Sequence, residues 1–322
     1  MDKNKLKAKN LKLLWENFSE KIIPLSGLFF MCVLLSIASP YFLTVSNILA
    51  IGVQTTVIAL LGIGVTFVII TAGIDLSVGS ILGFSAIVTT YFMANITNVY
   101  LAILVGLASG TIAGLVNGII TTKGKIHPFI ATLGMMGIAR GLALIISGGM
   151  PISGLPQIYS FLGAGRIFGI PVPVIILIVF SVIAHIILTK TKLGRYTYAM
   201  GSNKEATRLS GINVDKYRTY VFGISGFMAA LGGIVQSSRL ITGQPTAGQG
   251  YELDAIAAAV IGGTSLLGGR GSITGTLIGA FIMGVLRNGA NLLNVSEFVQ
   301  QVVIGVIIVA ACIYDRYNRD LS

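Results

Sequence analysis

Long apolar segments recur through this chain of 322 residues, and they restrict its fold more than any other feature. About 20 apolar residues cross a hydrocarbon core of ~30 Å as a helix, and 54% of the residues here are hydrophobic. The sequence therefore predicts an all-α polytopic membrane protein. We expect about ten transmembrane helices, near residues 22–38, 48–71, 77–94, 99–121, 127–147, 171–188, 217–239, 252–268, 272–291 and 297–314.

The basic residues indicate how the chain is oriented. With the N-terminus in the cytosol, 18 of the 22 Lys and Arg residues fall on the cytosolic side, in agreement with the positive-inside rule. This topology also accounts for the net charge of +11 without a nucleic-acid partner, because basic loops face anionic lipid headgroups.

The expected spans form one transmembrane domain over residues 22–314. Residues 1–21 contain six lysines and several spaced apolar residues. Two interpretations of this segment stay open, namely an amphipathic helix at the membrane interface and a solvated cytosolic tail. Residues 315–322 are expected to form a second, short cytosolic tail.

A polar segment, residues 189–218, carries nine charges in a protein with only 10% charged residues. Ser202 and Glu205 have the spacing of a capping box, and Gly211 supplies a stop. Between them, Ala206 and Leu209 form a short apolar strip. A helix of two turns is unstable alone in water, so we expect it to dock on a soluble partner.

Four polar side chains in or beside the apolar segments are candidates for the translocation path or its gates. Such residues are costly at membrane depth and are often functional. Asp75 follows the second span, where capping of a helix start would also explain it. For Arg140, in the fifth span, structural and pathway roles both stay open. Asn288 and Asn291 add neutral groups, which suit a hydroxyl-rich solute better than an ion.

The arrangement of the spans suggests internal symmetry and close packing. Asp75 follows the second span and Asp254 the seventh, each at an expected helix start, on opposite sides of the membrane. This relation predicts a five-plus-five inverted repeat, although capping alone would explain both residues. The 41 glycines include pairs at small-xxx-small spacing, which predicts close helix contacts. Examples are Gly110/Gly114/Gly118 and Gly137/Gly141.

The sequence carries no catalytic, cofactor or metal signature. Residues 262–271 are Gly-rich but lack the Lys-Ser/Thr ending of a nucleotide-binding loop. His127 and His185 are far apart, and Cys32 and Cys312 lie in apolar spans, which indicates no metal site or disulfide framework. We therefore expect no enzyme activity and no cofactor in this chain.

Four motifs stand out along the chain: IDLSVG at 74–79, LGRY at 193–196, NKEATRLSGIN at 203–213 and QPTAGQGYELDAI at 244–256. With these motifs the chain resembles the sugar permeases of bacterial ABC importers, with the ribose permeases nearest. The likeness runs over nearly the whole chain, and as a set the motifs are highly specific for the family.

The resemblance implies a multi-pass subunit of the bacterial plasma (inner) membrane, surrounded by lipid, that moves ribose or a similar small sugar by alternating access. It also implies a cytosolic ABC ATPase, an extracytoplasmic sugar-binding protein and a second permease, expected to be an identical copy. In such importers a short cytosolic helix, often Glu-Ala-Ala with a later Gly, fits a cleft on the ATPase. Glu205, Ala206 and Gly211 match this pattern, while Thr207 replaces the second Ala.

Alternatives to this function stay open at this point. Within the family, the substrate could be another pentose, a hexose or autoinducer-2. Outside it, a stand-alone secondary transporter would need no partner. The docking segment and the lack of an ion-coupling chain of Lys, Asp or Glu side chains disfavour that alternative.

Overall fold

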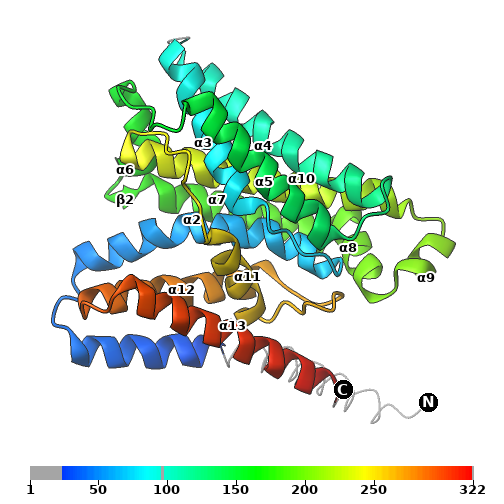
Figure 1. Ribbon diagram of the computed structural model, residues 1–322. Coiled ribbons are helices and arrows are strands. Elements are labelled where there is room, and N and C mark those ends of the chain that lie inside the picture. Colours follow the sequence, from blue (N-terminus) through cyan, green and yellow to red (C-terminus); the bar gives the residue numbers. More distant parts are fainter. Residues whose placement is uncertain (1–23, 96–97, 321–322) are drawn as a thin grey trace.

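The fold is a bundle of helices that lie roughly along one another (Figure 1). The computed structural model describes residues 24–95 and 98–320, so the tail or interfacial helix expected over residues 1–21 lies outside the described residues. Within the described ranges the strands are two residues each, β1 (Arg166–Ile167) and β2 (Ile170–Pro171), paired antiparallel.

Seven described helices are long and apolar enough to cross a membrane, which confirms the all-α polytopic class. They are α2 (Val45–Ile70), α3 (Val78–Asn95), α4 (Val99–Thr122), α5 (Pro128–Ser147), α7 (Val172–Lys190), α10 (Val214–Leu240) and α12 (Ile273–Leu292). Shorter elements are η1 (Gln157–Ser160), α6 (Phe161–Ala164), α8 (Lys192–Ser202) and α9 (Lys204–Leu209).

Three further helices differ in length from the expected spans. Pro24–Ala38 is apolar but short, and α13 (Glu297–Asp320) continues through most of the segment expected as a C-terminal tail. The prediction of a continuous span over residues 252–268 is wrong. The helix there, α11 (Tyr251–Ile261), has 11 residues, or ~16 Å at 1.5 Å per residue. It ends because Gly262 and Gly263 follow, the latter with φ +87°.

Polar residues at the helix starts fix where the spans begin. The Thr44 side chain accepts from the Asn47 N–H at the start of α2. Asn98 and Ser272 cap α4 and α12 in the same way. Each cap satisfies one of the backbone N–H groups that a helix start leaves without a partner.

Helix α10 lies at the centre of the bundle and packs against α4, α2 and α3. The approach to α4 is close, and Gly114 there contacts the Phe222 carbonyl and the backbone of Gly226. A side chain larger than hydrogen would not fit there, so the prediction of close packing is confirmed for this glycine series. Within the described residues it is wrong for Gly137 and Gly141 of α5, because no atom of another element lies within 4 Å of the position that a side chain there would occupy.

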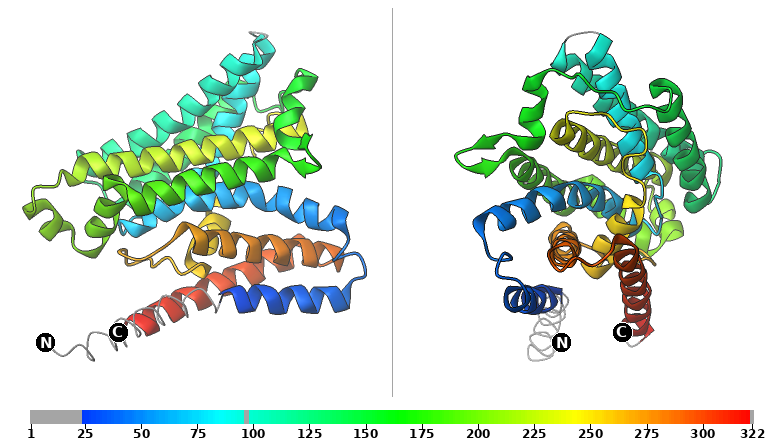
Figure 2. Two further views of the ribbon diagram at one scale, coloured as in Figure 1. Left: turned by 180° about the vertical axis from the view of Figure 1, so that it is seen from behind. Right: turned by 60° about the vertical axis from the view of Figure 1, so that its left-hand side comes forward.

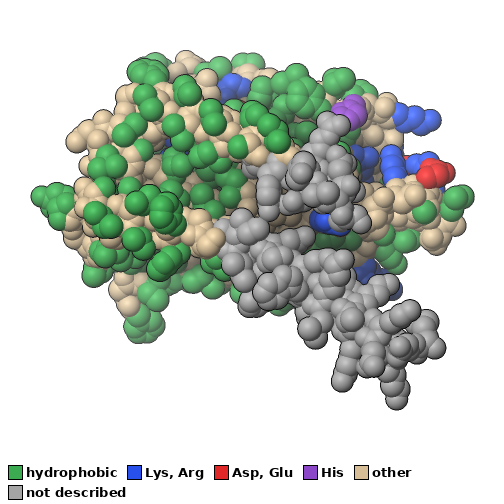
Figure 3. All heavy atoms as spheres, turned by 90° about the horizontal axis from the view of Figure 1, so that it is seen from below, with side chains coloured by type: hydrophobic (Ala, Val, Ile, Leu, Met, Phe, Trp, Pro, Cys, Tyr) green, Lys and Arg blue, Asp and Glu red, His purple; other side chains and the backbone are tan. Residues whose placement is uncertain are grey.

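The two ends of the bundle differ. Helices α8 and α9 protrude at one end, and both opposite views in Figures 1 and 2 show α9 as the outermost described element there. Seen from below, Lys and Arg side chains gather mainly toward this end, whereas hydrophobic side chains cover much of the remaining surface (Figure 3).

Candidate docking helix and membrane-buried polar groups

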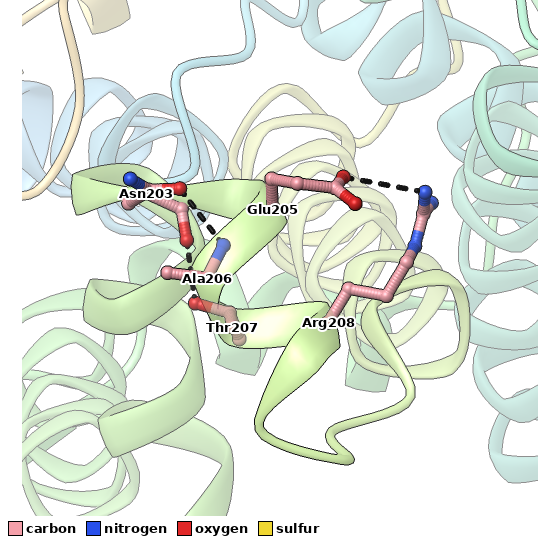
Figure 4. A network of polar contacts seen from close by, with 5 residues as sticks. All are labelled: Asn203, Glu205, Ala206, Thr207 and Arg208. Carbon is pink, nitrogen blue, oxygen red and sulfur yellow. Dashed lines mark hydrogen bonds and ion pairs between the residues drawn. The ribbon is translucent and has the colours of Figure 1, made fainter.

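Helix α9 is a short exposed helix that begins one residue later than expected. Its N-cap is Asn203, whose Oδ1 accepts from the Ala206 N–H at 2.9 Å, and the Thr207 hydroxyl donates to the Asn203 carbonyl at 2.8 Å (Figure 4). The capping box predicted for Ser202 and Glu205 is therefore wrong. Ser202 is the last residue of α8, and the capping oxygen comes from the amide next to it.

The side chains predicted to dock on a partner lie on the surface of α9. Glu205, Ala206 and Leu209 are exposed, and Leu209 is 80% exposed, whereas Thr207 is buried against the rest of the chain. Gly211 follows the helix with φ +81°, a conformation that favours glycine. The apolar strip thus has no cover within the described residues.

Helix α8 attaches α9 to the bundle. Gly201, near its end, contacts the Ile70 carbonyl at the end of α2, and the Gly269 N–H donates to the same carbonyl at 2.9 Å. Farther back, the Tyr198 hydroxyl donates to the Gly271 carbonyl at 2.7 Å. A side chain at position 201 would overlap the end of α2. Helix α8, which leads directly into α9, is therefore packed against the end of α2 and bonded to the loop before α12.

The charge around α9 is mainly positive. Partial burial lowers the pKa of Lys204, and the nearby positive charges of Arg218 and Arg208 lower that pKa further. Glu205 and Arg208 form an ion pair at 3.6 Å whose side chains are both more than half exposed. Solvent screens such a pair, which contributes on the order of 0–1 kcal/mol. Both charges therefore remain accessible to a partner.

Asp75 lies in a buried polar cluster between three helices. It is fully buried in the turn between α2 and α3, and its Oδ1 accepts from the Ser77 N–H at 3.0 Å and the Ser77 hydroxyl at 2.5 Å. Its Oδ2 accepts from the Ser225 hydroxyl of α10 at 2.7 Å. Asn117 of α4 donates to the Ser77 hydroxyl at 2.9 Å. The carboxylate does bind an N–H beside the start of α3, but it also ties α10 to that turn, while the Ser77 hydroxyl ties α4 to it.

Arg140 anchors irregular backbone. Its Nη1 donates to the Pro245 carbonyl at 2.5 Å and to the Ala247 carbonyl at 2.8 Å. Both carbonyls belong to the segment 241–250, which connects α10 to α11. Arg140 thus joins α5 to that connection. Of the interpretations left open by the sequence, the geometry supports a structural bond to backbone carbonyls inside the bundle.

The two asparagines of α12 bind neighbouring elements. Asn288 and Asn47 form a reciprocal amide pair, with N–H to oxygen distances of 2.8 and 3.0 Å. Asn291 accepts from the Gln300 amide of α13 at 2.9 Å. None of the hydrogen bonds among the described residues joins any two of the four predicted path residues.

The described residues also contain no group of three or more His, Cys, Asp or Glu side chains that could hold a metal ion.

Residues 47–312 match the family described as branched-chain amino acid transport system / permease component. The chain belongs to this family.

Individual relatives are similar to this permease over nearly its whole length. The ribose import permease protein RbsC of Bacillus subtilis is 45% identical over 98% of this chain and 99% of its own. The protein of the same name in Escherichia coli K12 is 45% identical, with 92% and 93% covered. The D-allose transport system permease protein AlsC of Escherichia coli K12 is 40% identical, with 95% and 94% covered. No solved structure matches.

Two polar contacts in this permease are missing from the sequence-based candidates. Asp254 lies in the first turn of α11, close to the expected helix start, but it makes no capping bond and its carboxylate pairs with Arg287 of α12 at 2.6 Å. Asn47 is the second omission. The sequence did hold a signal for the pair Asp254–Arg287, because an acidic and a basic residue lie in adjacent apolar segments. No local pattern links Asn47 to an amide 241 residues away.

Proposed function

We propose that this chain is the membrane-spanning permease subunit of an ATP-binding-cassette importer for ribose or a similar small sugar. The observation that carries this proposal is 45% identity to ribose import permeases over nearly the full length of the chain. The permease is not an enzyme, and ATP hydrolysis belongs to a separate cytosolic subunit. The chain resides in the bacterial inner membrane.

Ribose is favoured over related sugars because the ribose import permeases are more similar to this chain than its allose and arabinose relatives, which are 40% and 38% identical. The polar groups at membrane depth fit such a neutral cargo. Each amide or hydroxyl both donates and accepts hydrogen bonds, as a sugar hydroxyl does. Another pentose, a hexose or autoinducer-2 is the alternative cargo.

For topology, we propose a cytosolic N-terminus and ten crossings. Nine apolar helices supply nine of them. The tenth is the stretch 241–261, in which an irregular segment precedes α11. Discontinuous crossings of this kind are common in transporters built from inverted repeats, so we keep the five-plus-five repeat as part of the proposal. The basic end with α8 and α9 is then cytosolic.

For assembly, we propose that two identical permeases pair and that each docks one face of an ABC ATPase through α9, with Ser202 and Gly211 flanking the helix in sequence. The exposed Leu209 supports this role, because burying a leucine side chain contributes about 1.5–3 kcal/mol. Glu205 and Ala206 lie on the same exposed helix. An extracytoplasmic sugar-binding protein delivers the cargo at the opposite end.

The mechanism that we propose is alternating access. Motion of the ATPase moves α9, and the rigid attachment through α8 passes that motion to α2. Arg140 lies beside the sugar path. Asp75, Asn288 and Asn291 act at its gates by holding helices together in one of the two states.

The test is co-expression of the chain with a candidate ATPase and binding protein, followed by co-purification and ribose uptake. Glu205→Arg is expected to abolish both co-purification and uptake at normal membrane abundance. Glu297→Arg, the same exchange at an exposed position near the other end, is the control and should leave co-purification intact. Normal uptake by Glu205→Arg would refute docking through α9. Uptake without any ATPase would indicate a secondary transporter instead.

A further inference from the structure

The connection between α10 and α11 places polar side chains at membrane depth on an uncovered part of the protein. Residues 241–250 form a series of turns, in which Gly248 and Gly250 have φ of +73° and +83°. Its course follows α3. Gly243 contacts Thr90, the Ala247 carbonyl lies over Gly83, and the Gly248 carbonyl contacts Gly79. From Thr90 to Gly79 is ~16 Å along a helix of 1.5 Å rise per residue, so the segment runs inside the span of α3.

Backbone of this kind is unusual at such a depth. Hydrocarbon offers no hydrogen bonds, and non-helical backbone there is tolerated only where protein buries it or where it lines a water-filled space. Arg140 satisfies the carbonyls of Pro245 and Ala247 from the side of α5. On its other side the segment is open, because Gln244, Thr246 and Gln249 are all exposed.

In Figure 1 the 241–250 trace runs from the end of α10 to the start of α11, on the side where α5, α11 and α13 lie toward the viewer. Two amides and a hydroxyl facing lipid would each cost free energy without a compensating hydrogen bond. The exposed side of the segment therefore faces water, a polar ligand or the second permease of the proposed pair, and not lipid.

We propose that Gln244, Thr246 and Gln249 bind the sugar during its passage through the membrane. This inference rests on the proposed function and extends it to named ligand groups. All three side chains are neutral and can both donate and accept, which matches sugar hydroxyls and gives no preference to an ion. Arg140 is a positioning residue, because it holds the carbonyls of the segment and leaves these three side chains free to contact the cargo.

The first experiment measures ribose uptake by the complete importer in proteoliposomes, normalised to the amount of assembled complex. Gln249→Leu and Thr246→Val keep the side-chain size and remove hydrogen bonding. Each is expected to lower uptake roughly threefold to tenfold, since one hydrogen bond is lost. Gln157→Leu, at an exposed position on η1, is the matched control and should transport like the wild type.

The second experiment asks what the segment faces. Gln249→Cys is placed in a chain with Cys32→Ser and Cys312→Ser, and a charged, water-soluble thiol reagent is added. Labelling that slows during ribose transport supports the proposal. Labelling by a lipophilic maleimide alone, or a disulfide between two copies at position 249, overturns it. Wild-type uptake by both Gln249→Leu and Thr246→Val overturns it as well, while the proposed function stands. A wild-type complex that moves no sugar would instead refute the proposed function.

Discussion

The buried carboxylate of Asp75 offers a direct test of how the bundle is held together. Its two oxygens accept three hydrogen bonds, two from Ser77 and one from the Ser225 hydroxyl of α10. The substitutions Asp75→Ala, Asp75→Asn and Ser225→Ala perturb these bonds in different ways. Their relative effects on the free energy of unfolding follow from the geometry.

Ser225→Ala removes one bond to the carboxylate, at a cost of about 1.5–3 kcal/mol, the range for hydrogen bonds to charged groups. Asp75→Ala removes all three and leaves buried donors without acceptors, so we expect a cost of about 3–5 kcal/mol. In Asp75→Asn, the amide oxygen can still accept from Ser77, and the NH₂ can donate to the Ser225 hydroxyl. Because this change also removes a buried charge, we expect a cost of ~1 kcal/mol or less.

The assay is unfolding of the purified permease in mixed micelles by titration with sodium dodecyl sulfate. The expected order of destabilisation is Asp75→Ala, then Ser225→Ala, then Asp75→Asn. The double variant Asp75→Ala/Ser225→Ala should cost less than the sum of the two single changes, because both remove the same bond. Equal effects of Asp75→Asn and Asp75→Ala, or exact additivity in the double variant, would refute this account of the cluster.

Three further predictions use other contacts. Asn47→Ala and Asn288→Ala should each lower the free energy of unfolding by roughly 0.6–1.7 kcal/mol in the same assay. The double variant should lose little more than either single variant, and additive losses would contradict a shared pair. Gly201→Ala should separate α8 from the end of α2, leaving ATPase co-purification intact while ribose uptake falls; unchanged uptake would argue against a rigid attachment. The double variant Lys204→Gln/Arg208→Gln should weaken ATPase binding and make that binding less dependent on salt. Binding is measured at two or more ionic strengths, and an unchanged salt dependence would exclude electrostatic attraction at α9.

The class of fold was predictable because hydropathy acts over about 20 consecutive residues and needs no knowledge of distant contacts. The prediction failed where local backbone chemistry overrides hydropathy. Residues 252–268 are apolar enough for a span, yet Gly262 and Gly263 end α11 after 11 residues. Similarly, Ser202 has the right spacing for a cap, but Asn203 is an equally good capping residue and lies one position closer.

The candidate site was predictable only in part, for a related reason. The proposed docking face of α9 is local, so Glu205, Ala206 and Leu209 could be proposed from a single segment. The membrane groups depend on partners far away in sequence. Arg140 bonds to carbonyls 105 and 107 residues away, and Asn288 pairs with an amide 241 residues away. A residue type at membrane depth indicates that a partner exists, but not which one.

The attachment of α9 gives the proposed mechanism a physical route from a small surface helix to buried groups. The Ile70 carbonyl at the end of α2 lies against Gly201 and accepts from the Gly269 N–H. Only five residues later, Asp75 binds α10 and the start of α3. Between them the chain turns sharply at Ala72, with φ +57°, and the turn is closed by the Gly73 N–H to the Val68 carbonyl. Under the proposed mechanism, a displacement of α9 acts on a short, hydrogen-bonded turn whose far end is a buried three-helix junction. Because the turn spans only five residues and is closed by hydrogen bonds, it links the two places with little slack.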